Sequence, residues 1–230
     1  VTAIVVPVNR AGRGRGPRYV VKKGKTPVLT AAEARQLIDA IDTRTLKGLR
    51  DRAIIAVMVY TFARVSAVVG MNVEDYHAIG KRSWIRLHEK GGKHHEVPAH
   101  HSAADYLDAY VAAAGISEQR KMPLFRTIRR VKGAAGTSDV RSSAHELTNQ
   151  RTTRMDVLRL IKRHATAVGI AADRICCHTF RATGITAYLE NGGTLEHAQA
   201  IAAHESPRTT KLYDRTSDAI AVDEIERILI

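Results

Sequence analysis

The sequence predicts a mainly α-helical fold that carries a small antiparallel β-sheet. Most of the chain places apolar residues at helical spacing, whereas residues 84–98 alternate between apolar and polar side chains around a Gly-Gly pair. The chain has 230 residues, of which 44% are hydrophobic and 5% aromatic. It can therefore form one large domain, or one and a half small ones, with a core made mostly of Ala, Val, Leu and Ile.

Residues 1–27 are predicted to form a basic linker or arm that lies along phosphates. They contain no acidic residue, and their glycines keep the backbone loose. A disordered basic leader is the alternative interpretation of the same composition. The basic residues of this segment are Arg10, Arg13, Arg15, Arg18, Lys22, Lys23 and Lys25.

Two helices are expected next. Thr30 and Glu33 match a capping box, with Leu29 before them as a hydrophobic staple, so a helix should run to about Ile41. A second helix is expected over residues 46–62, and its broad apolar face predicts deep burial. The residues expected to face inward in the first helix are Ala34, Leu37, Ile38 and Ile41.

Arg64 follows as a lone charge among small and apolar residues. A buried arginine is costly unless it meets an anion. Three interpretations are open: Arg64 clamps a phosphate, forms an internal salt bridge, or is a surface side chain that reaches solvent.

Residues 84–98 predict a β-hairpin. Trp84–His88 and His95–Val97 alternate, and the Gly-Gly pair between them suits a tight turn that presents Lys90 and Lys93 at its tip. Residues 72–76 are expected to begin a third strand.

The middle of the chain mixes helical and polar segments. Residues 102–114 predict an amphipathic helix, 123–125 a short buried segment, and 126–150 a mobile surface loop. A helix is expected from Thr152 or Thr153 to about Val168. Its predicted packing residues are Met155, Val157, Leu158 and Ile161, and its predicted outward residues are Arg154, Arg159, Lys162, Arg163 and His164. The outward face suits DNA contact or simple solvation equally well.

Residues 176–215 concentrate the reactive side chains. His178 and Arg181 are three residues apart near the start of a predicted helix and share one face. Gly192-Gly193 ends that helix, Thr194 starts another that runs to about Ala203, and Ser206-Pro207 starts a third. His204 and Tyr213 accompany these turns, so the segment gathers two imidazoles, a guanidinium and a phenol. An apolar-sided last helix is expected over residues 218–230.

Charge and composition narrow the partners. A formal net charge of +13 favours nucleic acid or an anionic membrane surface. No apolar run approaches the roughly 18 residues that span a bilayer, and no signal peptide is visible. The only cysteines, Cys176 and Cys177, are adjacent and pair poorly with each other, which indicates a reducing, cytoplasmic setting.

The sequence predicts neither a metal nor a nucleotide cofactor. Histidines cluster at residues 94–101, and His178 follows two cysteines, but no zinc-binding spacing is present. Neighbouring strand residues also point to opposite faces, which suits chelation poorly. No phosphate-loop or dinucleotide-binding glycine pattern appears.

The separated signals together resemble the tyrosine recombinases, or phage integrase family, over about residues 28–215. They are Arg64, a hairpin lysine, the H-x-x-R pair, the Ala-His204-Glu-Ser segment and the Thr-Thr-Lys-Leu-Tyr213 ending. The resemblance implies a helical catalytic domain over residues 28–216. It also implies a site-specific DNA recombinase, an integrase or transposase, that uses no cofactor and forms a 3′-phosphotyrosine bond.

The resemblance also implies a role for each residue. Tyr213 would be the nucleophile, and Arg64 and Arg181 would grip the non-bridging oxygens. His178 would act as general base or orienting donor, and His204 would donate a further hydrogen bond. The general acid for the leaving 5′-oxygen would be Lys90, which precedes the Gly-Gly pair, with Lys93 as the alternative.

The chain departs from the family pattern in two ways. Family members often have an acidic residue three positions after the first arginine, where this chain has Ala67; Glu205 and Asp75 are candidate replacements. A helical core-binding domain usually precedes the catalytic domain, and residues 1–27 are too short for one. The chain is therefore expected to be the catalytic part of a larger integrase.

The implied partner is double-stranded DNA at the bacterial nucleoid, with a homotetramer in the synapse and a monomer possible without DNA. The last helix, residues 217–230, would dock on a neighbouring protomer or, alternatively, pack on its own domain. The remaining alternatives are a topoisomerase that only relaxes DNA, a non-catalytic DNA-binding regulator, and a protein whose basic surface binds a membrane or RNA.

Overall fold

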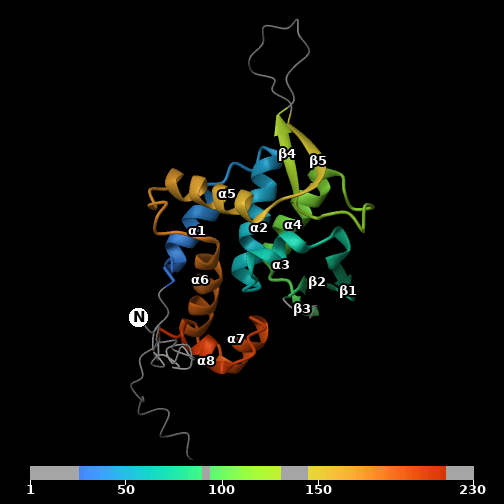
Figure 1. Cartoon of the computed structure of the whole chain (residues 1–230). Helices are drawn as coiled ribbons and strands as arrows, with labels where there is room; N and C mark the ends of the chain where they lie inside the picture. The colour runs from blue at the N-terminus through green and yellow to red at the C-terminus, as the bar shows by residue number, and fades with distance from the viewer. Residues whose placement is uncertain (1–25, 90–93, 131–144, 216–230) are drawn as a thin grey trace, which may run out of the picture.

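The structure is a computed structural model that describes residues 26–89, 94–130 and 145–215. The predicted basic arm, the hairpin tip with Lys90 and Lys93, and the last helix therefore lie outside the described residues. The described part is mainly helical and carries a small antiparallel sheet, as the sequence predicts, together with a second two-stranded sheet (Figure 1).

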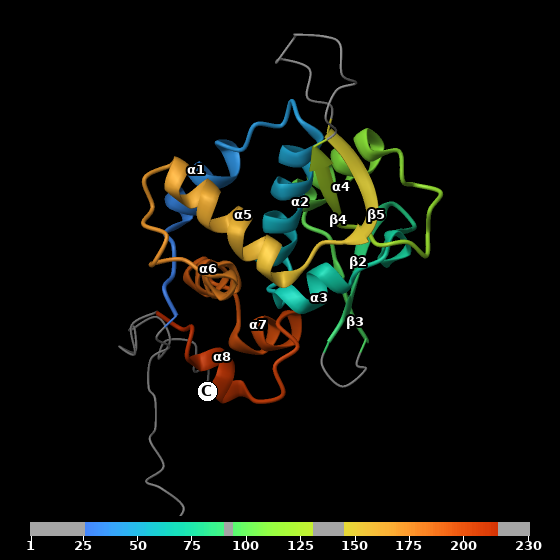
Figure 2. The same ribbon diagram turned by 45° about the horizontal axis from the view of Figure 1, so that its top comes forward.

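Helix α2 (Leu46–Tyr60) is the central helix, and five other helices pack against it (Figure 2). They are α1 (Ala31–Asp39), α3 (Val65–Gly70), α4 (His101–Ala114), α5 (Arg154–Ala167) and α6 (Cys177–Glu190). Its residues 53–58 are fully buried, which explains its broad apolar face. The predicted start of α1 is confirmed, because Thr30 and Glu33 form a complete capping box.

Three strands form the sheet beside α3. Strands β1 (Tyr76–Ile79), β2 (Arg82–His88) and β3 (His94–Pro98) pair antiparallel in the order β1-β2-β3, with His88 opposite His94. The predicted hairpin is confirmed. The third strand begins later than expected, because residues 73–75 form a 3₁₀ turn, η2 (Val73–Asp75), capped by Asn72.

Residues 126–150 were expected to be a surface loop, and this expectation is wrong for their described part. Strands β4 (Arg126–Arg130) and β5 (His145–Arg151) pair antiparallel, and Thr127 and Thr148 hydrogen bond across them at 2.6 Å. β-Branched residues on facing positions stabilise such a ribbon despite its polar composition.

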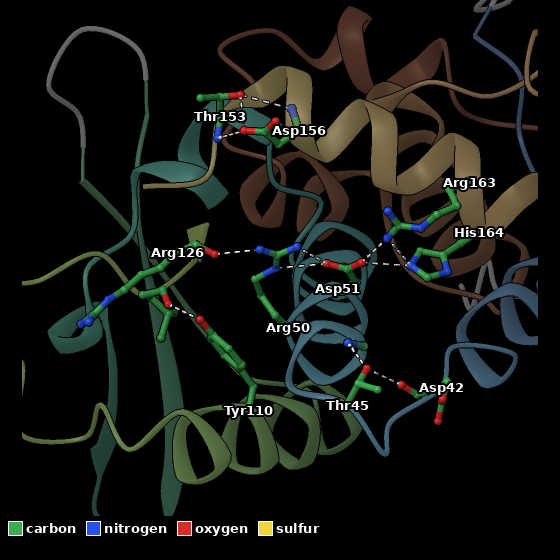
Figure 3. Close-up of polar contacts among 12 residues, drawn as sticks. Asp42, Thr45, Arg50, Asp51, Tyr110, Arg126, Thr153, Asp156, Arg163 and His164 are labelled. Atoms are coloured by element: carbon green, nitrogen blue, oxygen red, sulfur yellow. Dashed lines mark hydrogen bonds and ion pairs between the residues drawn. The ribbon is translucent and has the colours of Figure 1, made fainter. Parts of the chain in front are cut away.

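Helix α5 is capped by Thr153 and Asp156, as expected, but two predictions about its faces are wrong. Met155 is 55% exposed instead of packed. His164, which was expected to point outward, is only 17% exposed and contacts Asp51, which is fully buried on α2 (Figure 3). Arg163 reaches the same carboxylate while its side chain stays 47% exposed, as expected. An unpaired carboxylate would be costly there, so the two basic groups follow the buried charge.

The chain then forms α6, α7 (Leu195–Ile201) and α8 (Pro207–Lys211). A second, smaller apolar cluster lies beneath these three helices; it comprises Phe62, Ala182, Ile185, Leu189, Ala198, Ala202 and Tyr213. The cluster places the end of α2 against the last described turns of the chain, where the predicted reactive residues lie.

Candidate active site

Tyr213 lies just beyond α8 and is only 8% exposed. Its hydroxyl oxygen is 3.2 Å from Nε2 of His178. The Tyr213 backbone is fixed on both sides, since its N–H donates to the Thr210 carbonyl and its carbonyl accepts from the Thr186 hydroxyl. Two residues that are 35 positions apart thus meet within hydrogen-bonding distance.

Arg181 lies one turn after His178 on α6 and is almost fully buried. Its guanidinium donates to the carbonyls of Phe62 and Ala202, so it joins the end of α2 to the end of α7. Its Nε is buried and has no hydrogen-bond partner among the described residues. Burial and nearby Arg64 lower the pKa of Arg181 to about 10, and Tyr213 and Glu89 act in the opposite direction.

Two non-glycine residues beside Arg181 adopt left-handed backbone conformations. Phe62 has a φ of 53° and Ala203 a φ of 48°. Such conformations cost of order 1 kcal/mol each for residues with a Cβ, and they are common at functional sites. Here they aim the Phe62 carbonyl at Arg181 and lead the chain into His204.

His204 is buried, and its ring is stacked parallel to the Tyr213 ring with 5.9 Å between centroids. Its Nδ1 lies 2.9 Å from the Thr210 hydroxyl. Burial, followed by the charges of Arg181 and Arg64, lowers the pKa of His204 to about 3. The same causes lower the pKa of His178, so both imidazoles are neutral at pH 7.

Arg64 caps the start of α3 and forms an ion pair with Glu89, at 2.6 Å between Nη1 and Oε2. The expected internal salt bridge is therefore present. The side chain is still 38% exposed, and it lines an open cleft of about 800 Å³. The other residues that line this cleft are Ser66, Glu89, His94, His95, Ala203, His204, Glu205, Ser206 and Thr209.

The structure therefore brings together five of the six predicted residues: Arg64, His178, Arg181, His204 and Tyr213. The sixth, Lys90, lies outside the described residues with its alternative Lys93. The strand that begins after them, β3, is tied to the site, because Nε2 of its His95 lies 2.9 Å from the Ile201 carbonyl at the end of α7.

Sequence reasoning missed three contributors: Glu89, His95 and Thr210. Thr210 belongs to the Thr-Thr-Lys-Leu-Tyr ending, so its position three residues before Tyr213 is the one signal that could have found it. His95 and Glu89 act across the fold, and their partners are 106 and 25 residues away. Local spacing carries no signal for such contacts.

The structure also shows where the candidate carboxylates lie that could take the place of an acidic residue at position 67. Asp75 binds within the sheet region, where its oxygens lie 2.9 Å from His88 and accept the Asn72 N–H. Glu205 lines the cleft. Glu89, which neither expectation named, is the carboxylate that contacts Arg64.

Within the three described ranges, no group of three or more His, Cys, Asp or Glu side chains is placed to hold a metal ion. No helix in the described part of the chain is long and apolar enough to cross a membrane.

The sequence pattern of the phage integrase family matches residues 27–219, which include every candidate residue. The chain belongs to the phage integrase family. Among its relatives are the tyrosine recombinases XerD of Lacticaseibacillus casei, 32% identical over 83% of this chain, and XerD of Staphylococcus haemolyticus, 27% identical over 87%. The chain spans 58% and 61% of the length of these two relatives.

Solved structures of this family share the fold. XerA recombinase superposes with a TM-score of 0.61 at 22% identity, over 89% of this chain and 64% of that one. Lambda integrase (residues 75–356) bound to DNA gives 0.60 at 16% identity, over 94% and 70%. A lambda integrase tetramer bound to a Holliday junction gives 0.61 at 16% identity, over 94% and 56%.

Proposed function

We propose that this member of the phage integrase family is the catalytic domain of a site-specific DNA recombinase, which breaks and rejoins DNA through a 3′-phosphotyrosine intermediate. One observation carries the proposal: a tyrosine hydroxyl lies 3.2 Å from a neutral imidazole, close to the buried Arg181 and to Arg64, which lines the cleft. That arrangement supplies a nucleophile, a base and positive charge at one point.

In the proposed first step, the Tyr213 oxygen attacks the phosphorus of a DNA phosphodiester. Its proton passes to Nε2 of His178, because a free phenol has a pKa of about 10 and needs a base near neutral pH. The phosphorus–O5′ bond breaks as the phosphorus–tyrosine bond forms. Lys90 donates a proton to the departing 5′-oxygen, and a free 5′-hydroxyl results.

The cationic groups stabilise the negative charge that grows on the non-bridging oxygens. Arg64 reaches the cleft directly. Arg181 has two of its nitrogens held by backbone carbonyls, so it supplies a fixed positive charge and the remaining N–H groups of its fork. Fixed charges need no reorganisation during the reaction, which is the source of most catalysis in phosphoryl transfer.

His204 is proposed to donate a hydrogen bond to the same phosphate. If the Thr210 hydroxyl donates to Nδ1, the neutral ring carries its proton on Nε2. In the return step, a 5′-hydroxyl from another strand attacks the phosphotyrosine and releases Tyr213. The bond energy is kept in the intermediate, so the reaction as proposed uses no nucleotide and no metal.

The proposed partner is double-stranded DNA, and the proposed assembly is a homotetramer at synapsis with a monomer possible without DNA. The net charge of +13 supports a polyanionic partner. The tetrameric assembly is supported by the similar fold of lambda integrase, which was solved as a tetramer bound to a Holliday junction. Docking of residues 217–230 on a neighbouring protomer remains part of the proposal, as does the role of residues 1–27 as a basic arm.

The first prediction concerns Tyr213→Phe. The variant should form no denaturation-resistant protein–DNA adduct and should bind DNA with nearly unchanged affinity, because only the hydroxyl is lost. The adduct is measured on denaturing gels with a pool of duplexes that carry randomised flanks around one 5′-bridging phosphorothiolate. The sulfur leaves without a proton and returns poorly, so the adduct accumulates.

Tyr188→Phe is the matched control, since Tyr188 lies on α6 in edge contact with Phe62 and outside the proposed chemistry. It should form adduct like the parent chain. Adduct from Tyr213→Phe would contradict the assignment of the nucleophile. A parent chain that binds DNA and never forms an adduct would instead support a DNA-binding regulator.

A further inference from the structure

Glu89 is the last described residue before the hairpin tip, and its side chain is only 7% exposed. Its carboxylate lies 2.6 Å from Arg64 and also acts on the pKa of Arg181. Glu89 therefore places one buried negative charge beside both arginines of the proposed site. A buried carboxylate is stable only with such partners, so the contact defines the position of both groups.

The contact leaves most of Arg64 available. It joins Oε2 of Glu89 to Nη1, which is one of three guanidinium nitrogens. Arg64 remains partly exposed and lines the same cleft as His204. Arg64 is thus held at one of its nitrogens while its side chain lines the cleft.

The sequence explains why this chain needs such a contact. Position 67 is a fully buried alanine on α3, one turn after Arg64, where many family members have an acidic residue. Ala67 offers Arg64 no anion. Glu89 reaches Arg64 from the end of β2 instead, and α3 and β2 pack together.

We propose that Glu89 is a positioning residue that orients Arg64 toward the scissile phosphate, in place of a carboxylate at position 67. The inference rests on the proposed strand-transfer function. Since Glu89 directly follows β2, the same ion pair also fixes the end of that strand relative to Arg64. Glu89 touches neither the phosphate nor the leaving group.

This role predicts that rate and affinity change in different directions. Loss of the carboxylate frees the Arg64 side chain to sample other rotamers, so attack on the phosphorus slows. The same loss removes a negative charge from a DNA-facing cleft, so the attraction of DNA stays equal or increases. A carboxylate that merely blocks the phosphate site would predict faster cleavage on removal.

The test measures adduct formation by Glu89→Ala and Glu89→Gln on two substrates. The first is the phosphorothiolate duplex pool, and the second is a set of nicked all-oxygen duplexes with the sequences recovered from that pool. We expect Glu89→Ala to be at least tenfold slower than the parent on both substrates. Glu89→Gln keeps an acceptor oxygen without the charge, so it should be intermediate. DNA affinity, measured by anisotropy in a Tyr213→Phe background, should be unchanged or tighter.

The control is Glu96→Gln, which removes a carboxylate from an arginine on the same sheet, since Glu96 pairs with Arg86 at 2.7 Å. It should match the parent. Should Glu89→Ala lose its fold in a thermal melt, the isosteric Glu89→Gln carries the test.

Parent-like or faster cleavage by both Glu89 variants would overturn the inference and leave the proposed function intact. Slower cleavage of the all-oxygen duplex alone would also overturn it. The sulfur leaving group of the phosphorothiolate needs no proton, so such a result would place the defect in proton donation by Lys90 and not in the orientation of Arg64. Absence of adduct from the parent chain on both substrates would instead contradict the proposed function itself.

Discussion

At the residue scale, the two histidines differ in how they are held. His178 faces the Tyr213 hydroxyl and is available as a base, whereas His204 is engaged by Thr210 and stacked on the Tyr213 ring. Burial and the two arginines lower both pKa values, so protonation of either ring is suppressed near neutral pH. The site is therefore organised to use neutral imidazoles.

A pH profile tests this organisation. The base form of His178 persists above its folded pKa, which lies below the ordinary value of 6.5. Adduct formation on the phosphorothiolate substrate should therefore stay level as pH falls from 7 and decline only with an apparent pKa below 6.5. A decline centred at or above 6.5 would contradict the role of a desolvated His178. Tyr188→Phe should show the parent profile.

Five of the six candidate residues named from the sequence lie together in the structure, and the sequence could name them because their types and local order are specific. His178 and Arg181 are one helical turn apart, and His204 and Tyr213 follow turns whose caps are readable. It does not predict Glu89 as the partner of Arg64, because an ordinary charged residue at a hairpin base carries no signal of what the fold brings to it.

At the element scale, the close approach of α6 to α2 sets the position of Arg181. Gly184 allows this approach, because a Cβ at that position would lie 2.1 Å from the Val59 carbonyl oxygen and 2.8 Å from Phe62 Cδ1. Backbone cannot yield as a flexible side chain can. The glycine therefore lets the Arg181 guanidinium reach the Phe62 carbonyl.

Gly184→Ala should consequently force the two helices apart. We expect a loss of about 1–3 kcal/mol in unfolding free energy, typical of overpacking, and a cleavage rate reduced by more than tenfold. Chemical denaturation and the adduct assay measure the two effects. Gly70→Ala is the matched control, since its added Cβ would meet nothing within 4 Å. Equal behaviour of the two variants would contradict the argument.

Asp51 connects two further elements. Asp51 lies on α2 and accepts hydrogen bonds from Arg50 on the same helix. It also contacts Arg163 and His164 on α5 (Figure 3). Arg50 in turn donates to the Arg126 carbonyl at the start of β4. Burial opposes ionisation of Asp51, but these partners outweigh burial and lower its pKa. The cluster is an ion network that fixes α5 on the core.

Asp51→Asn should lower the unfolding free energy by about 3–5 kcal/mol at pH 7, because the buried Arg50 loses its carboxylate partner. A folded pKa below the unfolded value of 3.8 means that the Asp51 contribution is complete above about pH 5. It is lost as pH falls through the folded pKa. Parent and variant should thus converge in stability toward low pH, as urea titrations would measure. A difference that is constant with pH would contradict the network.

The elements themselves show where sequence reading succeeds. Capped, periodic helices such as α1 and α5 were predicted with nearly correct bounds, because caps and apolar spacing are local. The β4–β5 ribbon was not predicted, since its strands are polar and its pairing spans residues 126–151. The predictions for Met155 and His164 are wrong because the neighbours of α5, and not its own pattern, decide which side chains find partners.

At the scale of the whole molecule, two surfaces meet at the cleft. Glu89 and His95 line it from the β2–β3 hairpin, and His204 lines it from the turn after α7, with His178 and Arg181 on the neighbouring helix α6. Figure 2 shows the β2–β3 hairpin and the α6–α8 segment on the two sides of α3. These two sides of the cleft are held together by long-range contacts, such as the one between His95 and the Ile201 carbonyl. Membership of the family predicts this convergence, whereas composition predicts only a basic, mainly helical protein.

The most direct measurement identifies the residue that is joined to DNA. The adduct trapped on the phosphorothiolate duplex pool is digested, and the peptide that carries the nucleotide is sequenced by mass spectrometry. The account predicts a single attachment, at the Tyr213 oxygen, on the 3′ side of the cleaved bond. Attachment at another residue, or a linkage to the 5′ side, would contradict the convergence of these residues on one phosphorus atom.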